Sequence, residues 1–162
     1  MSSIEPTRFA DGRPMLLAGL RREHTFADAE QSIPRQWSDF QRLTPIPGHR
    51  GASTYGVMCG TSPERGTFEY MCGVEVDSFD RLPEGMGRMR VPAQRYAVFP
   101  VDGGPGALPA MWGYVFNDWL PRSAFVSAET PDFEVHGERI DPRNGDGEIE
   151  IWVGIRDAAS GE

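Results

Sequence analysis

A tryptophan-bearing helix is predicted by residues 28–43, DAEQSIPRQWSDFQRL. Its apolar side chains recur at intervals of four, three and three residues, which places them on one stripe of an α-helix. The members of this stripe are Ile33, Trp37, Phe40 and Leu43. Ser32 is a suitable N-cap, and Pro34 would then fall in the first turn, where its missing N–H group costs nothing.

A second helix of the same kind is predicted by residues 108–120, LPAMWGYVFNDWL, about 75 residues further along the chain. It also has a proline near its start, and Pro121 follows it as a stop signal. Its apolar face consists of Trp112, Val115, Phe116 and Trp119. The two stretches look like the same structural element used twice.

Runs of alternating apolar residues, bounded by glycine and proline, predict strands around both helices. These strands are expected at residues 15–26, 53–60, 67–78, 91–103, 132–139 and 148–155. The order is strand–helix–strand–strand, repeated once. We therefore expect an α+β fold made of a tandem strand–helix–strand–strand (SHS2) repeat. Its single curved antiparallel sheet would carry the two main helices on one side.

The composition of the 162-residue chain is that of one globular domain with an acidic balance, and its net charge is −8. Phosphate binding needs a basic face, so no direct nucleic-acid partner is expected. All sixteen basic residues are arginine, and the absence of lysine excludes a P-loop lysine and Schiff-base chemistry. No run of about 18 apolar residues occurs, so no contact with a membrane is expected.

The N-terminus lacks a basic segment followed by an apolar stretch, which favours a cytoplasmic location. Cys59 and Cys72 fall on neighbouring predicted strands; reduced thiols are the preferred interpretation, although a bridge between them stays conceivable. No histidine or cysteine shows metal-ligand spacing, and neither a metal nor a cofactor is expected.

A carboxylate interrupts an apolar strand in residues 132–138, DFEVHGE. By alternation, Glu134 and His136 point to one face of the strand, and Phe133 and Val135 point to the other. Alternation alone favours a wet face and a solvated Glu134. The opposite interpretation, in which Glu134 is aimed into a pocket, would give the strand a functional role.

Six motifs occur in the order found in a known family: YGVMCG (55–60), FEYMCGVEV (68–76), LPEGMGRMRVPAQRYAVF (82–99), WLPRS (119–123), PDFEV (131–135) and EIEIWVGI (148–155). Together they resemble the GyrI-like, or bacterial transcription activator effector-binding, family, and within it the stand-alone effector-binding proteins carried on integrons. The resemblance implies a single effector-binding domain over residues 15–156, with pseudo-repeats at about 15–80 and 86–156. By composition, residues 1–14 and 157–162 are expected to be flexible tails.

The resemblance also implies a ligand cleft between the repeats, with Glu134 as its buried carboxylate. Aromatic walls are expected from Tyr70, Trp112, Trp119, Tyr55 and Trp37. The pattern alone assigns the helical tryptophans to the core at least as well, so both interpretations stay open. His136, which replaces an aromatic residue usual in the family, lies beside Glu134 by parity. Glu150 is a second candidate carboxylate on the last strand.

The leading hypothesis is a stand-alone, multidrug-type protein that binds a small lipophilic or cationic molecule. A first alternative is a hydrolase of strained or electrophilic toxins such as cyclopropanoids, in which Glu134 would be catalytic. A second alternative is a protein-binding inhibitor or adaptor, since some relatives in the family bind partners such as gyrase. Binder and enzyme need the same cleft, so the sequence leaves both open, with binding preferred.

Overall fold

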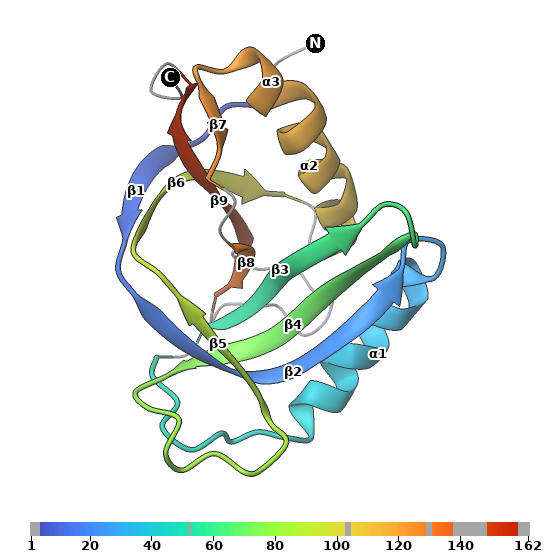
Figure 1. Ribbon diagram of the computed structural model, residues 1–162, viewed down its shortest axis with the longest axis vertical. Helices are drawn as coiled ribbons and strands as arrows, with labels where there is room; N and C mark the ends of the chain where they lie inside the picture. The colour runs from blue at the N-terminus through green and yellow to red at the C-terminus, as the bar shows by residue number, and fades with distance from the viewer. Residues whose placement is uncertain (1–3, 52, 103–104, 129–130, 138–148, 159–162) are drawn as a thin grey trace. The chain divides into compact units, whose positions relative to one another are not determined.

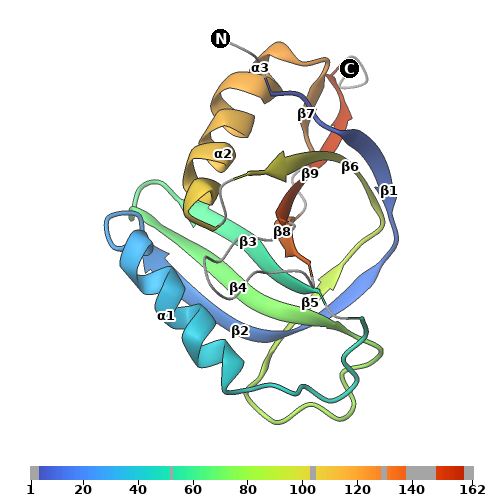
Figure 2. The ribbon, with the colours of Figure 1, turned by 180° about the vertical axis from the view of Figure 1, so that it is seen from behind.

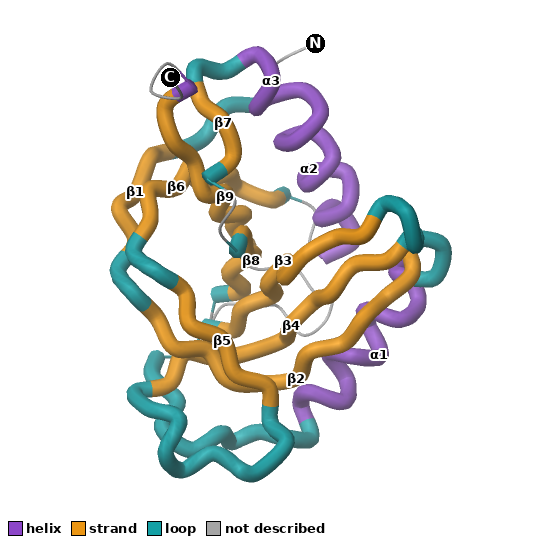
Figure 3. The backbone as a smooth tube through the Cα atoms, viewed as in Figure 1, coloured by secondary structure: helices purple, strands orange, loops and turns teal. Residues whose placement is uncertain are grey.

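The computed structural model describes residues 4–51, 53–102, 105–128, 131–137 and 149–158 (Figure 1). It divides into two compact units. The continuous unit is Pro14–Val91, and the split unit joins Met1–Arg13 to Pro92–Glu162. Each unit combines antiparallel strands with helix (Figure 3), which confirms the predicted α+β class.

The continuous unit is an antiparallel sheet with one helix. Its elements are β2 (Met15–Thr25), α1 (Ala29–Gln41), β3 (Thr54–Ser62), β4 (Thr67–Val76) and β5 (Gly87–Val91). The strands lie in the order β3-β4-β2-β5. Helix α1 lies against one face of β2 and β4 in both views (Figures 1 and 2), and buries Phe40 there with Tyr70, Cys72 and Val74.

Helix α1 begins four residues earlier than the predicted N-cap Ser32 implies. Asp28 occupies the N-cap position, so Pro34 lies inside the helix and not in its first turn. The proposed N-cap Ser32 is therefore wrong. Its hydroxyl instead lies 2.6 Å from Nδ1 of the buried His24.

A buried glutamine fixes this helix to the sheet. The Nε2 group of Gln36 donates to the carbonyl oxygens of Leu20 and Tyr70 at 2.8 and 2.9 Å, and its Oε1 bonds Nε2 of His24. Because the Gln36 oxygen can only accept, His24 must carry a proton on Nε2. Both strands under the helix are thus joined to it by a polar network, whose side chains Gln36 and His24 are buried.

Three glycines lie side by side across this sheet. Gly19 on β2 is opposite Gly73 on β4 and Gly87 on β5. A Cβ atom at Gly19 would overlap the carbonyl oxygen of Cys72 and lie 2.7 Å from the Cα atom of Gly73. The strands approach so closely along this row that any side chain at Gly19 would meet backbone atoms.

The split unit repeats the strand–helix–strand–strand order with additions. Its strands are β1 (Arg8–Gly12), β6 (Gln94–Val101), β7 (Phe125–Ser127), β8 (Asp132–His136) and β9 (Ile149–Asp157). They lie in the order β1-β6-β9-β8, and β7 also pairs with β9. The helical segment is η1 (Pro105–Ala107), α2 (Leu108–Tyr114), a π-helical turn η2 (Val115–Trp119) and α3 (Leu120–Arg122).

The core of the split unit lies between the helical segment and strands β6 and β9. On β9, the alternating residues Ile149, Ile151, Val153 and Ile155 are buried, as predicted. Pro121 does not end the helix, because it occupies the first turn of α3, where a missing N–H group is harmless. Alternation along this strand also predicts that Glu148 faces away from the core, but Glu148 lies outside the described residues.

Three strands were not predicted: β1, β5 and β7. β1 falls within residues 1–14, for which a flexible tail was expected, and it pairs antiparallel with β6 from Arg8↔Val98 to Gly12↔Gln94. β5 falls almost wholly outside the strands expected from the sequence, in a stretch rich in glycine and arginine. Both are edge strands, whose short and polar sequences carry little periodicity. In the described part of the chain, no helix is long and apolar enough to cross a membrane.

Candidate functional site

Glu134 is a buried carboxylate on strand β8. It lies opposite Ile151 in the antiparallel register, so its side chain shares the face that packs under the helical segment. Only 3% of the residue is exposed. The interpretation of Glu134 as a solvated strand residue is therefore wrong, because helix α2 covers the face that alternation had left open.

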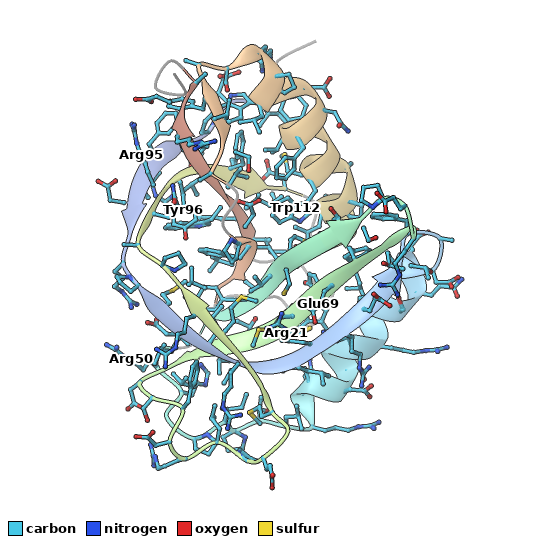
Figure 4. The ribbon with its side chains drawn as sticks, in the orientation of Figure 1. Arg21, Arg50, Glu69, Arg95, Tyr96 and Trp112 are labelled. Atoms are coloured by element: carbon cyan, nitrogen blue, oxygen red, sulfur yellow. The ribbon has the colours of Figure 1, made fainter. Side chains whose placement is uncertain are left out.

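Two ring N–H groups hold the Glu134 carboxylate. Trp112 lies on α2 (Figure 4), and its Nε1 donates to Oε2 at 3.0 Å. Nε2 of His136 lies 3.1 Å from Oε1. A carboxylate only accepts, which assigns the His136 proton to Nε2. Each carboxylate oxygen therefore has a donor, and the structure brings together three of the residues that the sequence singled out.

Trp119 lies at the centre of the core and does not reach Glu134. Its ring packs edge-on against Phe99 at 5.0 Å and stacks with Phe125 at 6.2 Å. Its indole N–H points to Oε1 of Glu5 at 3.4 Å. The π-helical turn Val115–Trp119 changes the angular spacing of the two tryptophans around the helix axis. Trp112 therefore points toward Glu134, and Trp119 points toward Phe99.

Tyr70, Trp37 and Tyr55 belong to the continuous unit. Nε1 of Trp37 donates to the hydroxyl of the buried Tyr70 at 3.1 Å, and the rings meet edge-on at 6.3 Å. Trp37 also packs edge-on against Phe40 in the core under α1. Tyr55, on β3, is opposite Gly73 and partly buried. Within the continuous unit, Trp37 therefore joins Tyr70 to the core under α1.

The opposite face of the split sheet carries the other candidate carboxylate. Glu150 and Trp152 project from β9 on the face away from the helices, with Trp152 stacked on Phe133 at 5.7 Å. Tyr96, which is labelled in Figure 4, lies on the same face. Its ring meets both of these rings edge-on at 5.3 and 5.4 Å. Trp152 is therefore part of an aromatic cluster. Sequence reasoning missed Tyr96, because it lies on β6 and its proximity depends on long-range pairing.

Asp132 was also missed, although it stands two residues before Glu134. Its Oδ1 accepts a hydrogen bond from the backbone N–H of Gly154 at 2.7 Å. Burial raises the pKa of Asp132 to about 7, against the lowering effect of that hydrogen bond. Burial, together with the charge of Asp132, also raises the pKa of Tyr96 to about 12.

Asp132→Asn is expected to stabilise the fold at pH 8 by on the order of 1–2 kcal/mol, and to change it little at pH 4. The folded-state pKa is above the unfolded value, so the protonated carboxyl stabilises the fold below about pH 4. This contribution is lost as the pH rises toward 7. Urea unfolding of both proteins at pH 4, 6 and 8 checks it. An equal difference at all three pH values would contradict the assignment.

Within the described ranges, no group of three or more His, Cys, Asp or Glu side chains is placed to hold a metal ion. Cys59 and Cys72 are free thiols. Burial raises the pKa of Cys59 to about 11, which keeps this thiol protonated and unreactive at neutral pH.

The α+β fold is that of GyrI-like effector-binding domains. A family described as integron-associated effector binding protein (Cass2) matches residues 13–155. The chain belongs to this family, which confirms the GyrI-like resemblance.

Two curated relatives are longer than the matched region. The transcriptional regulator BrlR of Pseudomonas aeruginosa is 30% identical over 127 residues, which cover 76% of this chain and 46% of BrlR. A DNA gyrase inhibitor of Erwinia billingiae is 33% identical over 93 residues, covering 56% of this chain and 58% of the relative. The chain thus spans about half the length of these relatives.

Solved structures show the same fold. SAV2435 bound to tetraphenylphosphonium has a TM-score of 0.74 at 18% identity, covering 92% of this chain and 93% of SAV2435. The integron cassette protein VCH_CASS2 from the mobile metagenome of Vibrio cholerae has a TM-score of 0.66 at 20% identity, covering 94% and 97%.

Proposed function

We propose that this protein binds lipophilic organic cations and that Glu134 is the anionic group that receives them. The observation that supports this proposal is the burial of Glu134, which is only 3% exposed. Each of its two carboxylate oxygens accepts a hydrogen bond from an aromatic ring N–H. A buried carboxylate has lost its hydration, which is costly. A cation bound beside it would stabilise it by electrostatic attraction, which is strong away from water.

The surroundings of Glu134 suit a large and hydrophobic cation. Trp112 and Phe116 stack with their ring centroids 5.9 Å apart, and Met111 packs against the same core. Aromatic faces attract cations by about 0.5–2 kcal/mol per ring, and methionine adapts to ligand shape. A relative with this fold binds tetraphenylphosphonium, a cation of this class. The ligand-binding domain would span residues 15–156.

Glu134→Gln is expected to weaken tetraphenylphosphonium binding roughly 10–100-fold, because it removes the charge and keeps the shape. Isothermal titration calorimetry measures this directly. Glu69→Gln is the matched control, because Glu69 is a strand carboxylate that forms an exposed ion pair with Arg21 at 2.6 Å. The control should change the affinity less than about twofold. Equal affinities of Glu134→Gln and the unmodified protein would end the proposal.

The hydrolase alternative rests on one observation, the contact between Glu134 and His136 at 3.1 Å. A carboxylate that orients an imidazole is a common arrangement for proton transfer. Incubation with cyclopropane-bearing compounds and analysis of products would detect turnover. Stoichiometric binding without product would reject the hydrolase alternative and retain the binding function. A partner protein, as in the gyrase inhibitor relative, remains a third proposal that a pull-down would test.

A further inference from the structure

An arginine of the N-terminal strand already occupies an aromatic site in the split unit. The guanidinium of Arg8 lies over the ring of Trp152, 5.4 Å from its centroid. The same guanidinium donates from Nη1 to Oε2 of Glu150 at 2.8 Å and from Nη2 to Oε1 at 3.2 Å. A planar cation is thus stacked on an indole and held by a carboxylate at two points.

The receiving side of this contact is built by three strands. Phe133 of β8 and Tyr96 of β6 support Trp152 from its flanks, and both are almost fully buried. Nε1 of Trp152 donates to Oε1 of Glu150 at 3.2 Å, which fixes the carboxylate beside the ring. Trp152 and Glu150 are therefore held in position by contacts that do not involve Arg8.

The contacts of Arg8 with Glu150 and Trp152 are partly exposed to solvent and contribute little free energy. The side chains of Arg8 and Glu150 are 48% and 32% exposed. Hydrogen bonding to Glu150 raises the pKa of Arg8. Burial alone would raise the pKa of Glu150, but the hydrogen bonds from Arg8 and Trp152 lower it below its usual value. The pair is ionised at neutral pH, yet exposed ion pairs and exposed ring contacts each contribute little. An external cation can therefore compete with Arg8.

We propose that Trp152 and Glu150 form a second cation site, on the sheet face opposite Glu134, and that Arg8 is its built-in competitor. The site takes planar amidinium or guanidinium groups, because it presents one flat ring and two acceptor oxygens in the arrangement that Arg8 uses. Phe133↔Trp152 and Glu134↔Ile151 are successive pairs of β8 and β9, so their side chains point to opposite faces of the sheet. The two sites are therefore on different faces. This inference does not depend on the function proposed for Glu134.

Benzamidinium is a suitable probe, because it carries a planar two-donor cation on a ring. Arg8→Ala is expected to bind benzamidinium about tenfold more tightly than the unmodified protein, since an exposed ion pair and ring contact together account for roughly that factor. Titration is followed at the indole ¹⁵N–¹H resonances, assigned by single Trp→Phe substitutions. The Trp152 resonance should move, because its N–H group bonds to Glu150.

Arg95→Ala is the matched control. Arg95 also lies 5.4 Å from an aromatic ring in the split unit, over Phe9, and its loss should leave benzamidinium affinity unchanged (Figure 4). The double variant Arg8→Ala, Glu150→Gln should lose the gain. The proposal is overturned if Arg8→Ala binds no more tightly than the unmodified protein, or if only the Trp112 resonance responds. Tetraphenylphosphonium binding, read at Trp112, tests the Glu134 site separately.

Discussion

Replacing Gly19 with alanine is expected to lower the free energy of unfolding by about 3 kcal/mol or more, near the upper end for overpacking substitutions. The added Cβ atom would overlap the carbonyl oxygen of Cys72 and lie 2.7 Å from the Cα atom of Gly73. These are backbone atoms of the paired strand β4, which cannot move aside by a rotamer change. The register of β2 with both β4 and β5 depends on this position.

Urea denaturation followed by circular dichroism gives the measurement for Gly19→Ala. Gly106→Ala is the control, because no atom lies within 4 Å of its added Cβ and its φ is not in the left-handed region. The control should change the free energy of unfolding by less than about 0.5 kcal/mol. If both variants behave alike, the strands are not as close at Gly19 as described.

Trp119→Ala is expected to cost about 3–5 kcal/mol, the usual range for removing a buried aromatic side chain. Trp119 is 3% exposed and joins the helical segment to Phe99 and Phe125. Its loss would leave a large cavity between the helix and strands β6 and β7.

The same denaturation experiment with Leu43→Ala provides the comparison. Leu43 completes the predicted apolar stripe of the first helix, but α1 ends at Gln41 and Leu43 is 39% exposed. Its truncation should cost less than about 1 kcal/mol. A Trp119→Ala variant as stable as Leu43→Ala would show that Trp119 lines an open space, as the family resemblance implied, and not the core.

Periodic elements were predictable because their pattern is local. Both helices and the long strands β2, β4 and β9 carry spacings that depend only on their own residues. The register that brings β1 to β6 depends on residues about 90 positions apart, which no local pattern encodes. The start of α1 was misplaced because Ser32 and Pro34 mimic an N-terminus, although the serine is used by His24.

The candidate site was predictable only in part. Alternation placed Glu134 and His136 on one face, and the family resemblance indicated that this face was functional. The sequence could not show that Trp112 would reach Glu134 while Trp119 turned toward Phe99, because a π-helical turn separates them. Arg8 lay outside every motif, and its role became visible only from its contacts with Glu150 and Trp152.

The pairing of β1 with β6 has a consequence for synthesis on the ribosome. Arg8 emerges about 90 residues before its partner Val98, which is roughly 5–20 s at ordinary rates of translation. During that interval the continuous unit can complete its own sheet, but β1 cannot yet pair with β6. The exposed acidic and basic side chains of this strand, Arg8 and Asp11, would discourage premature association of nascent chains in a polysome.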